Sequence, residues 1–110
     1  MKLENLPIGV VDWSRVPTVI QAGEAGTATA RTCDLGNITL RLVVYSSGFK
    51  ADHWCNKGHI VYVISGSLVI EHEDETRTAL STGKSWHAPD DAKSPHRVLC
   101  EAGATLFIVD

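Results

Sequence analysis

Short β-strand patterns separated by turn residues run through most of this chain, and they constrain its fold more than any other feature. β-Branched residues dominate these runs, and apolar residues seldom recur at the 3.6-residue spacing of a helix. The runs expected to form strands are Thr27–Cys33, Ile38–Val44, His59–Ile64, Ser67–Glu73, Thr76–Leu80, Lys84–Ala88, His96–Cys100 and Ala104–Val109. Many short strands with close turns in a small chain are typical of a sandwich or barrel. We therefore expect an all-β fold, a compact antiparallel barrel or jelly roll.

The length of 110 residues is enough for one hydrophobic core and therefore for a single domain over residues 1–110. Residues 1–26 carry several prolines and glycines, and we expect them to form an irregular N-terminal arm. The barrel is then expected to span residues 27–110.

Composition excludes several classes of function. The net charge is −3, and the ten Lys and Arg residues are scattered, so we expect neither nucleic-acid nor membrane-surface binding. The N-terminus lacks the apolar segment of a signal peptide, and no run of apolar residues reaches the length of a membrane span. Three cysteines in a chain without export signals favour the cytoplasm, with the thiols free or bound to metal.

A cluster of metal-binding side chains occupies seven residues in the middle of the chain. His53, Cys55 and His59 lie between two strand patterns, and Gly58 is suited to the last position of a three-residue hairpin loop. In such a hairpin His53 and Cys55 would share one face of a strand, and Cys55 would face His59 on the returning strand. We therefore expect three donors to converge from one β-hairpin. A hairpin with two polar histidines and a buried thiol is the alternative.

This segment resembles the first motif of the cupin superfamily, which is His-x-His, three or four residues, Glu, six residues and Gly. Here the corresponding residues are His53, Cys55, His59 and Gly66, so Cys replaces the second His and His replaces Glu.

A later segment resembles the second cupin motif, in which Gly, five residues and Pro precede a His after a turn. Gly83 and Pro89 have this spacing, and His96 stands for the closing His, with two extra residues before it. The runs Tyr45–Gly48 and Asp52–Cys55 look more closely like a subgroup of small bacterial cupins named for an Asp-His-Cys-Trp motif, and this likeness extends from about Trp13 to the end of the sequence. The resemblance implies a cupin-type antiparallel β-barrel.

The resemblance also implies one divalent metal inside the barrel, with His53, Cys55, His59 and His96 as its ligands. One thiolate and three imidazoles form a softer site than imidazoles with a carboxylate, so Zn²⁺ is favoured. Fe, Ni, Mn and Cu are also compatible with these ligands. The three-His-one-Glu set of Mn or Fe oxalate enzymes is absent, and those activities are not expected.

Three functions remain open from the sequence. The chain could be a metal-dependent enzyme acting on a small polar molecule, with catalytic residues that the sequence does not identify. It could instead be a non-catalytic ligand- or redox-sensing module with a structural metal, or it could hold no metal, with Cys55 as a free thiol. Cupins commonly pair, and we expect a homodimer in which the Trp13-bearing arm contacts a neighbouring barrel or covers its own.

Overall fold

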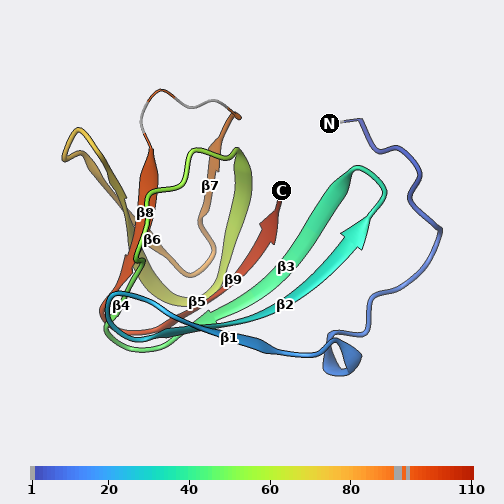
Figure 1. Cartoon of the computed structure of the whole chain (residues 1–110), viewed down its shortest axis with the longest axis horizontal. Coiled ribbons are helices and arrows are strands. Elements are labelled where there is room, and N and C mark those ends of the chain that lie inside the picture. Colours follow the sequence, from blue (N-terminus) through green and yellow to red (C-terminus); the bar gives the residue numbers. More distant parts are fainter. Residues whose placement is uncertain (1, 91–92, 94) are drawn as a thin grey trace.

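The computed structural model describes residues 2–90, 93 and 95–110, and it is nearly all β-structure (Figure 1). Within these residues the only helical element is the one-turn 3₁₀ helix η1 (Trp13–Arg15). The strands are β1 (Val19–Ala22), β2 (Thr27–Leu35), β3 (Ile38–Tyr45), β4 (Phe49–Lys50), β5 (His59–His72), β6 (Arg77–Ser81), β7 (Ser85–Ala88), β8 (His96–Cys100) and β9 (Ala104–Val109). The expected all-β antiparallel fold is confirmed. No helix in the described part of the chain is both long and apolar enough to span a membrane.

One long strand, β5, connects the two halves of a strongly curved antiparallel sheet (Figure 1). Its first half pairs with β9 and β7, and its second half pairs with β6 and β8. A register shift between Val63 and Ser65 precedes Gly66, whose φ is +87°. A Cβ atom on Gly66 would lie 2.3 Å from the Gly103 carbonyl oxygen. Glycine is therefore required at this bend, where the sequence pattern predicts a turn between two separate strands.

Strand predictions are most accurate at the end of the chain and weaker near its start. The expected strands at His96–Cys100 and Ala104–Val109 are confirmed with the same bounds. The arm over residues 1–26 is not wholly irregular, because it contains η1 and β1, and β1 pairs with β2. Strand β4 was not predicted, since two residues carry no recognisable alternation.

The core lies on the concave side of the sheet, between its two halves. Its most deeply buried side chains are Ile70, Leu106, Val63 and Cys100. On β3 the side chains of Val43 and Tyr45 belong to this interior, whereas Val44 between them is 47% exposed. The same alternation places Arg41 on the inner side, which brings a charged side chain beside the pocket described below.

Candidate metal centre

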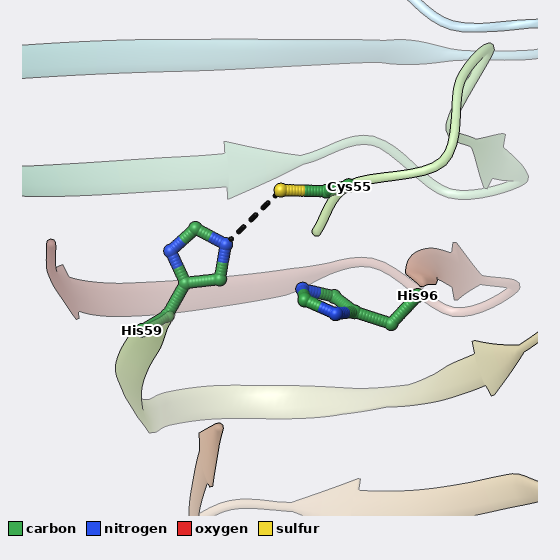
Figure 2. A group of neighbouring side chains, drawn as sticks. All are labelled: Cys55, His59 and His96. Carbon is green, nitrogen blue, oxygen red and sulfur yellow. Dashed lines mark hydrogen bonds between the residues drawn. The ribbon is translucent and has the colours of Figure 1, made fainter. Parts of the chain in front are cut away.

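Three of the predicted ligands come together in the structure. One donor atom from each of Cys55, His59 and His96 lies within 4.8 Å of the other two, and Figure 2 shows the side chains turned toward a common space. His59 begins β5 and His96 begins β8, while Cys55 lies in the loop that precedes β5. The Cys55 Sγ atom is 3.3 Å from His59 Nε2.

The predicted hairpin between His53 and His59 is wrong, although it led to two of the clustered residues. Residues 51–58 form a loop, and Cys55 pairs through its backbone with His96 rather than with His59. The Cys55 N–H donates to the His96 carbonyl at 2.7 Å, and the His96 N–H donates to the Cys55 carbonyl at 2.8 Å. This reciprocal bridge fixes the loop beside β8 and thereby brings a thiol to an imidazole 41 positions away.

A carboxylate that the sequence did not indicate holds the other side of the His59 ring. The Nδ1 atom of His59 forms a hydrogen bond with the Asp110 side chain, and Arg41 Nη2 lies 2.9 Å from the second Asp110 oxygen. Burial alone would raise the pKa of Asp110, but the His59 hydrogen bond and the Arg41 charge outweigh it and lower this pKa. Asp110 therefore remains an acceptor that orients Nε2 of His59 toward Cys55.

His96 is the most enclosed of the three side chains. It is 4% exposed, and its Nδ1 atom is buried with no hydrogen-bond partner among the described residues. Burial, and then the nearby His59 and His72, lower the pKa of His96 from 6.5 to about 4. The ring is therefore neutral at physiological pH, which is the form in which imidazole binds a metal.

The fourth predicted ligand, His53, lies apart from this cluster. Its side chain is 78% exposed, and its Nδ1 atom lies 2.7 Å from the Asp52 carboxylate. Hydrogen bonding to His53 lowers the pKa of Asp52. His53 contributes to the lining of the same pocket, and its role as a ligand stays a prediction.

A pocket of about 170 Å³ opens next to the cluster. Cys55, His59 and His96 line it, as do Arg41 and Tyr45. Tyr45 stacks on Phe49 with ring centroids 4.6 Å apart, and burial raises its pKa to about 12, so its hydroxyl keeps its proton. The remaining lining is mostly apolar, which is typical of small-molecule sites.

The other histidines and cysteines have simpler roles. The thiol of Cys100 is buried and donates to the Ser67 carbonyl at 3.3 Å. His87 is exposed, and His72 lies beside Trp86 with ring centroids 6.1 Å apart. Trp54 is covered by the Arg97 guanidinium, 4.4 Å from its ring centroid.

The clustered residues fit a metal ion. Ligands of a tetrahedral Zn²⁺ that bind through sulfur and nitrogen are separated by about 3.5 Å, close to the 3.3 Å between Cys55 and His59. A second observation is the unpartnered buried nitrogen of His96, because such groups are rare unless they have a ligand or a water. The Asp110–His59 contact is also the arrangement that commonly supports a metal-bound imidazole.

Comparison with known proteins identifies the fold but not the activity. No family model and no curated protein matches the chain. The polyketide cyclase RemF from Streptomyces resistomycificus is similar in structure, with a TM-score of 0.76 and 18% identity over 94% of this chain and 78% of that one.

Two further solved structures are similar over nearly their whole lengths. A predicted oxalate decarboxylase from Thermotoga maritima has a TM-score of 0.73 and 11% identity, covering 92% of this chain and 96% of that one. An RmlC-like cupin from Shewanella frigidimarina has a TM-score of 0.70 and 14% identity, covering 96% and 91%. The chain therefore has the cupin fold. Its closer likeness to the Asp-His-Cys-Trp subgroup stays a prediction.

Proposed function

We propose that this chain binds one divalent transition metal through Cys55, His59 and His96 and acts on a small polar molecule in the adjoining pocket. The observation that carries the proposal is the convergence of these three side chains in the lining of a cavity. Each of them has a feature suited to ligation: an accessible thiol, an imidazole oriented by Asp110, and a buried neutral imidazole.

Zn²⁺ is the metal that this ligand set favours. One sulfur and two imidazole nitrogens are borderline-soft ligands, and zinc accepts such mixtures in tetrahedral sites. Fe²⁺, Ni²⁺, Mn²⁺ and Cu²⁺ are the alternatives that a metal analysis distinguishes. Three protein ligands leave a fourth position for water or substrate, which is the pattern of catalytic rather than structural zinc sites.

When bound, the metal would supply Lewis acidity toward an oxygen of the substrate. The protein's own groups have separate roles. Asp110 holds His59 in one orientation, and the protonated Tyr45 hydroxyl offers a hydrogen bond to a group in the pocket. The rest of the pocket lining is mostly apolar.

Metal analysis of untagged protein tests the first part of this proposal. We expect about one metal per chain, and we expect Cys55→Ser and His96→Gln to lower that content strongly. Cys33→Ser and His87→Gln are matched controls, because they remove the same chemical groups outside the cluster. A wild-type protein that takes up no divalent metal would contradict the proposal.

The part played by His53 has its own test. His53→Ala should leave the metal content unchanged, since the exposed His53 side chain contacts Asp52 instead of the cluster. A strong loss of metal in this variant would instead support a four-ligand site. Turnover assays with the loaded protein then separate an enzyme from a binding module.

A metal-free sensing module is the second candidate. The contact between Cys55 Sγ and His59 Nε2 supports it, because the thiol and the imidazole satisfy one another directly. In that case Cys55 should react with a thiol reagent equally well before and after incubation with Zn²⁺. Protection of Cys55 by Zn²⁺ would exclude this candidate.

We further propose that the chain forms a homodimer through the outer side of β3 and β5. Val44, Ile60, Tyr62 and Ile64 are each between 44% and 47% exposed there, and they form the outer apolar face. Strand β9 lies between β3 and β5, so these residues belong to one continuous surface. Exposed apolar patches of this kind mark interaction sites in soluble proteins.

The N-terminal arm supports the same interface. Ile8 and Val10 are fully exposed, although the arm is anchored at both ends by Asn37 and by the Trp13–Phe107 contact. A second copy that covers the outer apolar face would also provide a surface for these side chains.

Light scattering should give the mass of a dimer at micromolar concentration. Tyr62→Glu should yield a folded monomer, whereas Thr82→Glu, on an exposed turn, should remain dimeric. A monomeric wild-type protein would refute the interface.

We also propose a cytoplasmic location. Cys33, Cys55 and Cys100 are all free thiols, as is typical of a reducing compartment. Cell fractionation tests this location.

A further inference from the structure

The side of the pocket formed by β3 carries hydrogen-bond donors. Arg41 and Tyr45 both project to the inner side of the sheet, and Gln21 on β1 lines the same pocket. The charged Arg41 and the protonated Tyr45 hydroxyl are complementary to an acceptor with negative charge. Cys55, His59 and His96 line the same cavity.

The charge of the pocket lining also favours an anion. The lining includes two arginines and no aspartate or glutamate. Arg97 is engaged elsewhere, by Glu71 at 3.0 Å and by the Trp54 ring. Arg41 contacts Asp110 through one nitrogen, Nη2, which leaves other N–H groups of its guanidinium for a further acceptor.

The size of the cavity limits the ligand. A volume of about 170 Å³ is well below the 300–1,000 Å³ of typical drug-sized sites. A nucleotide or a sugar phosphate is therefore too large to be enclosed. A carboxylic acid of a few carbon atoms fits.

We propose that the pocket binds a small carboxylate, whose oxygens accept hydrogen bonds from Arg41 and Tyr45. This names the substrate class of the proposed metal site and rests on that proposal only for the position of the metal beside the ligand. Arg41 and Tyr45 are then the residues that determine specificity, because an uncharged ligand would not form charge-assisted hydrogen bonds with the Arg41 N–H groups that Asp110 leaves free.

Titrations followed by ¹H–¹⁵N NMR spectra test this inference with matched pairs of probes. Acetate and propionate are compared with acetamide and propionamide, which have nearly the same shape without the charge. We expect each carboxylate to bind the zinc-loaded protein at least about tenfold more tightly than its amide, with the largest shifts at pocket residues. Equal binding of the two members of each pair would overturn the inference.

Variants locate the effect. Arg41→Gln should reduce acetate binding by about tenfold or more, and Arg41→Lys should restore part of it. Arg31→Gln is the matched control, because Arg31 is an arginine of the neighbouring strand β2 that does not line the pocket. If Arg41→Gln binds acetate as tightly as the wild-type protein does, the proposed role of Arg41 is refuted. If that variant does not fold, Tyr45→Phe decides the question, because unchanged acetate binding after loss of the hydroxyl would refute the proposed contacts.

The metal and the anion are tested independently. The same titrations are repeated after removal of zinc with a chelator, and metal content is measured separately. Carboxylate selectivity that depends on Arg41 in a protein that binds no metal would support this inference and contradict the metal proposal. Binding of one metal per chain without carboxylate selectivity would support the metal proposal and contradict this inference.

Discussion

The buried imidazole of His96 should make the metal-free protein sensitive to acid. Its pKa is about 4 in the folded chain and about 6.5 when exposed, so between these values the unfolded chain binds more protons than the folded one. The free energy of unfolding must therefore be highest above pH 6.5 and must fall as the pH is lowered toward 4. A difference of about 2.5 pKa units corresponds to a total loss of about 3.4 kcal/mol.

Urea unfolding of chelator-treated protein measures this loss. From pH 7 to pH 4.5, His96 alone should lower the free energy of unfolding by about 2.5 kcal/mol. His96→Gln should remove most of this dependence, and His87→Gln, at an exposed position, should keep it. Carboxylates with lowered pKa values, such as Asp110, also contribute less to the free energy of unfolding as the pH falls. Because all three proteins contain these carboxylates, their effect cancels in the comparison. Equal slopes in wild-type protein and in His96→Gln would refute the assignment of a buried neutral imidazole.

Three further predictions concern the support of the site and the fold. Asp110→Asn should weaken zinc binding by about 10- to 100-fold in a chelator competition assay, whereas Asp34→Asn, which alters a carboxylate bonded to a threonine instead, should leave it unchanged. Gly66→Ala should destabilise the protein by more than Gly48→Ala in urea unfolding, because both glycines have positive φ but only Gly66 has a backbone oxygen 2.3 Å from the added Cβ; equal losses would contradict the close approach. Leu106→Ala should cost about 2–5 kcal/mol in the same assay, since Leu106 is 1% exposed in the core.

Periodicity and turn residues predicted the strands because those signals are local. The alternation in Ala104–Val109 alone was enough to predict β9. The same reasoning failed between residues 51 and 58, where the chain forms a loop, so that strand alternation does not determine where side chains point. His53 was placed beside Cys55 on that basis, and the structure instead turns it toward Asp52.

Asp110 was missed for a different reason. It reaches His59 because the end of β9 lies beside the beginning of β5, and no motif or spacing relates the two positions. Arg41 was missed because its neighbours on the strand form an apolar pattern, and only the register of β3 and β9 shows that it meets Asp110. Knowledge of the strand order would have predicted both contacts from the sequence.

The long-range origin of these contacts has a consequence for folding. The bridge between Cys55 and His96 joins residues 41 positions apart, and the contact between His59 and Asp110 joins residues 51 positions apart. Neither contact can form in the unfolded chain, so the proposed metal would bind tightly only after the two halves of the sheet have closed. Binding to the folded state alone adds stability that increases with the logarithm of metal concentration. The midpoint of thermal unfolding should therefore rise with added Zn²⁺ in wild-type protein and stay constant in Cys55→Ser. A midpoint that stays constant in both proteins would show that the cluster does not bind Zn²⁺.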